Sequence, residues 1–243
     1  MSNQIRSFIK KKLLRKNNNL ISLDEPYEVM RHLLKGHDIT GIIDAGASDG
    51  RISKRLLRKF PAADAYAFEP NRLYFDSLQQ YTKENPRFHP YFLALSDHEG
   101  NADLHITRSP GNTSLLMPGR RLKEIDPRGS GAERLEKVQI VTIDDWAEHN
   151  GNLAIQLMKF DIQGGELKAL RGATRMLQYS TLLVYTEIWF NCPYEDGAIY
   201  SEIDLFLRKY GFVLYDIYKP KYNSNRLIMW GNAIFLNAER LGI

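Results

Sequence analysis

A glycine-containing segment and a glutamate that follows it have residue types and spacing suited to binding a nucleoside. The segment is IIDAGASDG, residues 42–50, and Glu69 comes 19 residues after its last glycine, directly before Pro70. Glycines allow a backbone to approach a ligand closely, and a helix behind them offers free N–H groups. A carboxylate at the end of the following strand is placed to accept hydrogen bonds from ribose hydroxyls. Together these features predict a site for a nucleoside-containing cofactor.

The composition of the glycine segment favours a cationic cofactor over a dinucleotide. A dinucleotide fingerprint has a second glycine that makes room for a pyrophosphate, but Ser48 stands at that position. Asp44 and Asp49 also add negative charge where a phosphate would bind. S-adenosylmethionine has a ribose, no phosphate and a positively charged sulfonium, so it is the cofactor that fits. The alternative is a tight turn between strand and helix that binds no ligand.

Two carboxylates are predicted to stand at neighbouring strand ends, where open α/β folds bind ligands. Asp161 follows the apolar run at residues 154–160, and Glu187 ends the next run, at residues 181–187. A general base speeds proton removal from a hydroxyl by ~10²–10⁴-fold, and we expect Asp161 to be that base with Glu187 beside it. Two facing carboxylates can instead share a proton or bind a divalent cation. The structural alternative is that Asp161 only caps the glycine turn before Glu166.

The histidines do not have the spacing of metal ligands. The chain has six of them, and none is spaced as in known zinc motifs, so we predict no metal site. His105 lies on a strand that enters a long loop, where it is a candidate contact to an acceptor. The alternation of that strand can equally place His105 on a solvated face.

Strand and helix patterns alternate along the chain in the way that builds a parallel sheet. Apolar strands are expected at residues 41–45, 65–69, 91–95, 154–160 and 181–187. Helices are expected at residues 27–35, 51–60, 72–83, 166–177 and 199–210. The fold class is therefore α/β, with one continuous domain over residues 27–243.

Two further pairs of strands are expected to be antiparallel. Residues 212–218 and 231–237 are too close in sequence for a crossover helix, so they should pair antiparallel. Residues 102–107 and 137–142 alternate like an inserted antiparallel pair. The loop between them is rich in Pro and Gly, and a loop of this length is usually functional or disordered.

The first 26 residues differ in composition from the rest of the chain. Six lysines and arginines lie within the first sixteen positions, and without them the net charge of +4 becomes −2. Three asparagines, residues 17–19, follow where a secretory signal needs an apolar stretch. We interpret residues 1–26 as a basic arm or helix that packs on the domain or is solvated. Weak docking of this arm on a membrane surface or on nucleic acid is the alternative.

The overall composition is that of a soluble globular protein. The chain has 243 residues, of which 43% are hydrophobic and 26% charged, and these are ordinary values for that class. Its single cysteine, Cys192, cannot form an internal disulfide, which favours a reducing compartment. No apolar run approaches the ~18 residues of a transmembrane helix. A cytoplasmic location is therefore expected.

Several blocks of the sequence, in order, resemble the FkbM-type S-adenosylmethionine-dependent methyltransferases. The resemblance covers residues 27–237 and leaves the basic arm outside. The glycine segment and AFEPN (67–71) are shared by many methyltransferases, whereas KFDIQGGELKALRGA (159–173) is specific. The other matching blocks are ALSDHEG (94–100), TIDDW (142–146), YTEIWF (185–190), GFVLYDIY (211–218) and GNAIFLN (231–237).

The resemblance implies a class I methyltransferase fold, which is Rossmann-like. Its seven-stranded sheet is mostly parallel and its last strand is antiparallel. The implied activity is O-methylation, commonly of hydroxyls on sugars, glycans or natural-product scaffolds. By position, Glu69 with Pro70 beside it would hold the ribose of the cofactor. The methionine part would lie against Asp44, Gly46, Ala47 and Ser48, and the adenine against Ala94, Leu95 and Ser96.

The resemblance also bears on the acceptor and on metal dependence. Asn112 and Ser114 flank Thr113 in the long loop, and this polar patch is similar to one in the family. We interpret it as an acceptor contact or a lid. Gln163 stands where many members carry Glu, which weakens a metal or base role at this position. A divalent metal is therefore expected not to be essential.

Three other functions remain open at this point. An RNA methyltransferase would use the basic arm as an electrostatic handle, but the rest of the chain is net negative, which makes nucleic acid a poor partner. A non-catalytic binding module would keep the fold and the cofactor pocket. A nicotinamide oxidoreductase fits the glycine turn least well. Residues 191–194, Asn-Cys-Pro-Tyr, are similar to an adenine N-methyltransferase signature, but they follow the wrong strand and lack its first proline.

Overall fold

The computed structural model describes residues 25–243. The basic arm predicted for residues 1–26 therefore lies outside the described residues, apart from Glu25 and Pro26. Pro26 is the first residue of helix α2 (Pro26–Leu33), and the Glu25 side chain caps that helix by accepting a hydrogen bond from the Glu28 N–H. Proline suits the first position of a helix because its missing N–H would have no helical partner there.

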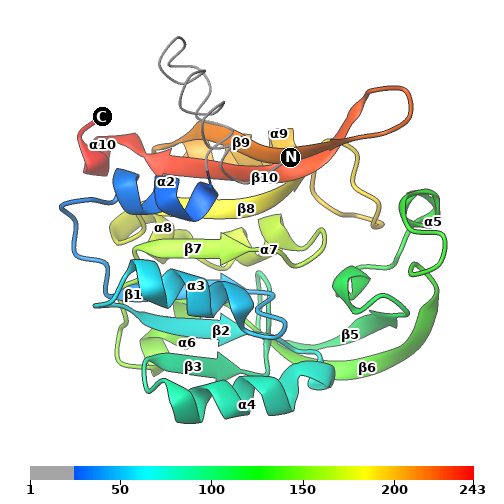
Figure 1. Cartoon of the computed structure of the whole chain (residues 1–243), viewed down its shortest axis with the longest axis horizontal. Helices are drawn as coiled ribbons and strands as arrows, with labels where there is room; N and C mark the ends of the chain where they lie inside the picture. Colours follow the sequence, from blue (N-terminus) through cyan, green and yellow to red (C-terminus); the bar gives the residue numbers. More distant parts are fainter. Residues whose placement is uncertain (1–24) are drawn as a thin grey trace, which may run out of the picture.

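A seven-stranded sheet forms the centre of the molecule (Figure 1). Its strand order is β3-β2-β1-β7-β8-β10-β9. β10 runs antiparallel to both of its neighbours, and the other pairings are parallel. The predicted sheet with an antiparallel last strand is confirmed. The strands are β1 (Gly41–Ala45), β2 (Asp64–Phe68), β3 (Phe88–Tyr91), β7 (Leu157–Phe160), β8 (Leu183–Trp189), β9 (Phe212–Tyr222) and β10 (Ile228–Asn237).

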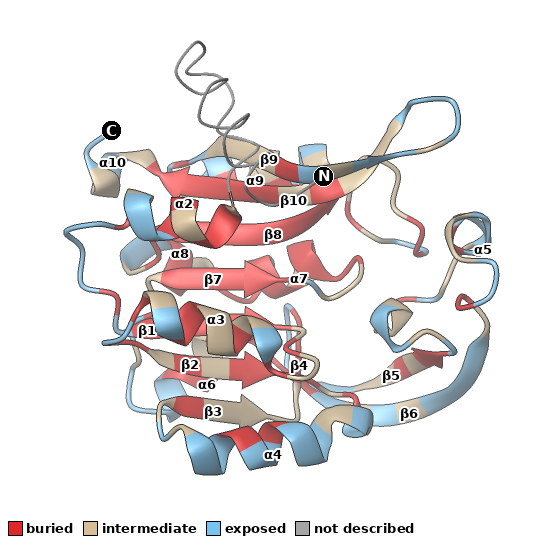
Figure 2. Ribbon diagram, viewed as in Figure 1, coloured by how far each residue is buried: buried red, intermediate tan, exposed pale blue. Residues whose placement is uncertain are grey.

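The innermost strands are buried along their whole length (Figure 2). Every residue of β1, β7 and β8 is buried, as expected for parallel strands covered on both faces. This explains why their sequences read as short apolar runs. The charged residues inside these runs, Asp44, Lys159 and Glu187, are exceptions that need partners.

Helices cover both faces of the sheet. One face packs against α2, α3 (Arg51–Lys59) and α4 (Phe75–Glu84), which follows a 3₁₀ turn at Arg72–Tyr74. The other face packs against α6 (Ile143–His149), α7 (Glu166–Arg171), α8 (Thr174–Tyr179) and α9 (Tyr200–Arg208). A short helix, α10 (Ala238–Leu241), ends the chain.

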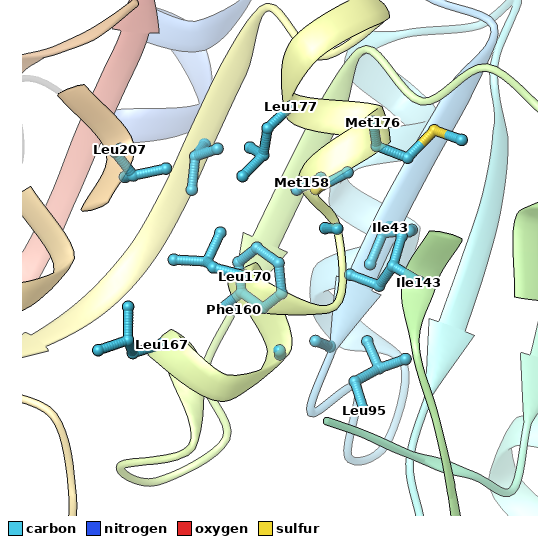
Figure 3. Close-up of a cluster of buried hydrophobic side chains, with 14 of the residues drawn as sticks. Ile43, Leu95, Ile143, Met158, Phe160, Leu167, Leu170, Met176, Leu177 and Leu207 are labelled. Carbon is cyan, nitrogen blue, oxygen red and sulfur yellow. The ribbon is translucent and has the colours of Figure 1, made fainter. Parts of the chain in front are cut away.

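The second face holds the larger cluster of buried side chains (Figure 3). Met158 and Phe160 of β7 meet Leu167 and Leu170 of α7 there. Burying apolar area stabilises a fold by roughly 25 cal/mol per Å², so this cluster holds α7 firmly against the end of β7. The loop between β7 and α7, which carries the candidate base, therefore has two well-anchored ends.

Two expected elements are divided in the structure. The helix predicted at residues 166–177 is two helices, α7 and α8, with Gly172 between them. A Cβ at Gly172 would lie 2.1 Å from the carbonyl oxygen of Ser96, so the chain must turn away there. The strand predicted at residues 91–95 is also divided, because β3 ends at Tyr91 and β4 (Ala94–Leu95) joins a different sheet.

The second sheet has three strands and lies beyond the carboxyl ends of the central strands (Figure 1). β5 (Gly100–Thr107) and β6 (Ala132–Val141) pair antiparallel, which confirms the predicted inserted pair, and β4 adds a parallel edge. A 3₁₀ turn at Pro110–Asn112 and helix α5 (Arg120–Ile125) occupy the connection. We call residues 100–141 the insertion. None of the helices within residues 25–243 has the length and apolarity needed to cross a bilayer.

Candidate active site

A cavity of about 940 Å³ lies between the carboxyl ends of the central strands and the insertion. The turn after β1, the end of β2, strand β4, the end of β7 and Glu187 of β8 all contribute to its lining. Most residues predicted for the site line this cavity: Gly46, Ala47, Ser48, Glu69, Pro70, Ala94, Leu95, Ser96, Ser114, Asp161 and Glu187. Asp44, His105 and Asn112 do not line it.

The turn after β1 is held against β2 by backbone hydrogen bonds. The N–H groups of Gly46 and Ala47 donate to the carbonyl oxygen of Phe68 at 2.9 and 3.1 Å. Gly46 has a φ of 71°, and a Cβ there would lie 1.9 Å from the carbonyl oxygen of Asp161. Glycine is thus required because the β7 end packs against the turn, a reason that the sequence pattern did not reveal.

Glu69 lines the cavity, and its side chain is bound by two backbone donors. The N–H of Ser48 donates to its Oε2 and the N–H of Asn71 to its Oε1, both at 2.9 Å. Burial raises the pKa of Glu69, although these two N–H groups oppose the shift. Each carboxylate oxygen retains a lone pair that can accept a further hydrogen bond. The arrangement therefore suits a ligand with two neighbouring hydroxyl groups.

Asp44 lies beneath the cavity rather than in its lining. It is fully buried, forms an ion pair with the Lys159 ammonium at 2.9 Å, and accepts a hydrogen bond from the Ser53 hydroxyl at 2.6 Å. The Lys159 Nζ also donates to the carbonyl oxygens of Ala45 and Gly46 at 3.1 and 2.9 Å. Burial opposes the charged ammonium, yet the Asp44 carboxylate holds the pKa of Lys159 above its usual value.

Lys159 lines the cavity and was not among the predicted site residues. The signal in the sequence was a lysine inside the apolar run LMKF, because an ammonium in a buried strand needs a carboxylate partner. The ion pair and hydrogen bonds of Lys159 connect β7 to the end of β1 and the turn after it. The pair therefore supports the floor of the cavity.

Two further carboxylates of the lining, those of Asp161 and Glu187, are joined by one amide. The Gln163 Nε2 donates to Asp161 Oδ1 at 2.9 Å and to Glu187 Oε2 at 3.0 Å. Asp161 is exposed and Glu187 is buried. Burial raises the pKa of Glu187 well above its usual value, and the charges of Asp161 and Glu166 add to the shift. An exposed and a buried acid thus share one hydrogen-bond donor.

Glu166 is a buried acid near Glu187 that does not line the cavity. It is fully buried at the first position of α7, and its Oε1 accepts the Ile162 N–H at 2.9 Å. Burial raises its pKa to about 7, although backbone N–H groups oppose the shift. Within residues 25–243, these acids and the histidines form no group of three or more side chains arranged to hold a metal ion.

The insertion supplies the wall of the cavity opposite the sheet. Ser114 is buried, and its hydroxyl donates to the Gln163 carbonyl oxygen at 2.8 Å. Thr113 also lines the cavity, and its hydroxyl oxygen is buried with no hydrogen-bond partner among the described residues. In the polar patch, Thr113 and Ser114 therefore contribute to the lining and Asn112 does not, but the buried Thr113 hydroxyl does not face the cavity. The Asn112 side chain instead donates to Asp126 at 2.9 Å and closes its own loop.

His105 lies on β5 but does not line the cavity. Its neighbours Leu104 and Ala102 do, and side chains alternate between the two faces of a strand. His105 therefore takes the opposite face, which was the alternative left open by the sequence. Its backbone forms a bridge to Ser114, with hydrogen bonds of 2.8 and 3.3 Å.

The segment after β8 closes against the insertion. The Gly119 N–H donates to the carbonyl oxygen of Pro193 and the Glu195 N–H to that of Met117, both at 2.9 Å. Tyr194 is buried, and its hydroxyl lies 2.8 Å from Gln163 Oε1. Its ring is thus not available to stack on a nucleic-acid base, in agreement with the view that residues 191–194 only resemble the adenine methyltransferase signature.

Similar proteins are methyltransferases from bacteria and fungi. The chain is 28% identical over 168 residues to "2-O-methyltransferase NoeI" of Sinorhizobium fredii, a match that covers 66% of this chain and 65% of that protein. It is 28% identical over 193 residues to "Methyltransferase sdnD" of Sordaria araneosa, covering 70% of this chain and 73% of that protein. The chain thus spans about two thirds of the length of these relatives.

Solved structures with a related arrangement share little sequence. Mycoplasma capricolum TrmK in complex with S-adenosyl-homocysteine superimposes with a TM-score of 0.46 at 8% identity, covering 89% of this chain and 69% of that chain. The family model described as "Methyltransferase FkbM domain" matches residues 44–214, which is well over half of the chain and includes both the glycine turn and the paired carboxylates. The chain therefore belongs to the FkbM methyltransferase family.

Proposed function

We propose that this protein is an S-adenosylmethionine-dependent O-methyltransferase that acts on a hydroxyl group of a sugar, glycan or natural-product acceptor. The observation that carries the proposal is one cavity that both Glu69 and the exposed Asp161 carboxylate line. The 2-O-methyltransferase relative supports a sugar hydroxyl as the acceptor.

The residues present fit this cofactor. Both oxygens of the Glu69 carboxylate have capacity for a ribose diol beyond the N–H groups they already accept. Leu95, Leu104 and Ile140 of the small sheet add apolar lining of the kind that suits an adenine. Ala47 and Ser48 would lie along the methionine part, and the carboxylates supply the negative charge that a sulfonium requires.

The acceptor side of the cavity positions a hydroxyl and removes its proton. When bound, the cofactor supplies an electrophilic methyl group. Asp161 accepts the proton of the acceptor hydroxyl, because it is the exposed carboxylate of the pair. Glu187 stays buried behind it and Gln163 joins the two.

The cofactor is tested by calorimetric titration with S-adenosylhomocysteine, run beside NAD. We expect binding of S-adenosylhomocysteine alone, weakened at least tenfold by Glu69→Ala, since losing hydrogen bonds to a charged group costs about 1.5–3 kcal/mol. Asp103→Ala is the matched control, because Asp103 is an exposed acid whose side chain pairs with Lys137 on the insertion. Binding of neither compound, or equal binding by the Glu69 variant, would overturn the proposal.

The acceptor is tested with a panel of monosaccharides, oligosaccharides and small hydroxylated natural products, with methyl transfer followed by mass spectrometry. On any acceptor that is methylated, Asp161→Asn should lower kcat by ~10²–10⁴-fold and leave S-adenosylhomocysteine binding intact. Chelation with EDTA should leave the rate unchanged. A rate lost on chelation and restored by Mg²⁺ would show that a metal takes part.

A further inference from the structure

The side-chain amide of Gln163 is hydrogen-bonded at both ends. Its nitrogen faces the Asp161 and Glu187 carboxylates, and its oxygen faces the hydroxyl of Tyr194 at 2.8 Å. The Tyr194 hydroxyl also lies 3.2 Å from the carbonyl oxygen of Asn112, which can only accept. One phenol therefore stands between the insertion and the amide that joins the two acids.

The orientation of the Gln163 side-chain amide determines whether a hydrogen-bond donor or an acceptor faces the two carboxylates. With the nitrogen toward them, both N–H bonds find acceptors and stabilise negative charge on the two acids. With the amide reversed, the Gln163 oxygen would lie against two carboxylate oxygens, an arrangement that repels once they are ionised. A donor on the far side favours the same orientation, and in the described structure that donor is the Tyr194 hydroxyl, which donates to Gln163 Oε1.

The ring of Tyr194 has a separate role in the same loop. Gly164 follows Gln163 with a φ of 96°, and a Cβ there would lie 3.2 Å from the Tyr194 ring. Gln163 itself has a φ of 57°, a left-handed conformation that is strained for a residue with a side chain. The ring thus packs on the loop backbone, while the hydroxyl acts on the side-chain amide.

We propose that Tyr194 is a positioning residue for the proposed methyl transfer, whose hydroxyl holds the Gln163 amide with its nitrogen toward Asp161 and Glu187. This role rests on the proposed function, because it concerns the carboxylate that takes the acceptor proton. The same hydroxyl lies 3.2 Å from the Asn112 carbonyl oxygen. Tyr194 therefore contacts both the insertion and the amide that joins the two carboxylates.

Other charged groups around Glu187 must be considered in any pH measurement. Asp161 and Glu166 raise its pKa, and Lys159 lowers it. Cys192 lies nearby on the segment after β8, and burial raises the pKa of its thiol to about 12. Tyr194→Phe changes none of these groups directly, so a shift in carboxylate ionisation would report the amide.

The test compares the wild type with Tyr194→Phe, which removes the hydroxyl and keeps the ring. Tyr91→Phe is the matched control, because the Tyr91 hydroxyl lies 3.4 Å from Asn150, outside the cavity. The primary measurement is NMR of the Gln163 side-chain amide, assigned by the loss of its signals in Gln163→Glu. The signals are followed against pH, where they report ionisation of the two acids.

In Tyr194→Phe we expect faster hydrogen exchange of the Gln163 amide and a carboxylate ionisation displaced to higher pH, with neither change in Tyr91→Phe. On a methylated acceptor, kcat should fall about tenfold, with its acidic limb displaced in the same direction and KM little changed. Unchanged amide signals and ionisation in Tyr194→Phe would overturn the positioning role.

Failure of the proposed function would be seen separately. In that case the wild type would not bind S-adenosylhomocysteine in the calorimetric titration, and this result does not depend on Tyr194. If Tyr194→Leu alone disturbs the amide while Tyr194→Phe does not, the ring and not the hydroxyl does the positioning, and the proposal is wrong.

Discussion

Buried ionisable side chains near the cavity differ mainly in whether each has a polar or charged partner. Lys159 has Asp44 and two carbonyl oxygens. Glu187 has the Gln163 amide. Glu166 has a backbone N–H for one oxygen, while its Oε2 is buried without a hydrogen-bond partner among residues 25–243. The consequences of removing each group should therefore differ.

Lys159→Met should destabilise the fold strongly. It leaves the buried Asp44 carboxylate without its counter-charge, and breaking such a pair costs about 3–5 kcal/mol. Urea unfolding measures the loss, and Lys159→Met combined with Asp44→Asn should recover part of it. The control Lys137→Met breaks an exposed pair with Asp103 and should cost at most about 1 kcal/mol. Equal effects of the two lysine substitutions would contradict the structural role of the buried pair.

Glu166→Gln should change the pH dependence of stability. The folded-state pKa is about 7 against an ordinary value of 4.5, so the fold favours the protonated acid. Its contribution is fully present below pH 4.5 and is lost as pH rises through 7. The uncharged variant should therefore match the wild type near pH 5 and exceed its free energy of unfolding by roughly 2–3 kcal/mol at pH 8. A difference that does not vary with pH would refute the shift.

At the scale of elements, α8 depends on a cap from another part of the chain. The Asp144 carboxylate, on α6, accepts the N–H groups of Arg175 and Met176 at 2.7 and 3.0 Å. Its backbone N–H donates to the carbonyl oxygen of Gly172 at 2.9 Å. These bonds hold the break between α7 and α8, where a single helix was predicted.

Asp144→Ala should remove this cap and loosen α8. Loss of a helix N-cap costs about 0.5–2 kcal/mol, and two backbone donors are left unsatisfied here, so a value near 2 kcal/mol is expected. Chemical denaturation gives the magnitude, with Asp103→Ala as a control that removes an exposed acid from the insertion. Ordinary surface substitutions change the free energy of unfolding by less than about 0.5 kcal/mol. A loss in that range would mean that packing alone sets the break between α7 and α8.

At the scale of the molecule, two sheets face one cavity. The small sheet supplies Leu95, Leu104 and Ile140 to the lining, and the central sheet supplies the glycine turn and the carboxylates. The two sheets are connected by the Ser114–Gln163 hydrogen bond and by backbone hydrogen bonds of Met117 and Gly119 to the segment after β8. A ligand in this cavity should therefore tighten both sheets together.

Hydrogen exchange with and without S-adenosylhomocysteine tests this coupling. Ligand at about 100 times its Kd adds roughly 2.7 kcal/mol to the stability of the bound state. Amides of residues 46–51 and of the insertion should both slow, while α10, far along the chain from the cavity lining, should follow only global stability. In Glu69→Ala both effects should diminish. Protection confined to the glycine turn would show that the insertion is not part of the cofactor-bound unit.

The order of strands and helices was predictable because local patterns encode it. Alternating apolar strands and amphipathic helices allow few arrangements, and a short last connection forces an antiparallel pair. The glycine turn, Glu69, Asp161 and Glu187 were found because strand ends of a parallel sheet meet at one edge. Their meeting in one cavity follows from topology, which the sequence determined by itself.

Only the tertiary structure decided which groups face one another across long distances in the chain. Three contacts join segments separated by many residues: the approach of Gly172 to Ser96, the Asp44–Lys159 pair and the Tyr194–Gln163 hydrogen bond. A sequence pattern reports periodicity within one element, so it cannot show that the face of β5 opposite His105 lines the cavity or which carbonyl fills the space beside Gly46. Those outcomes depend on packing between elements, where a shift of one residue or a few tenths of an ångström changes the contact.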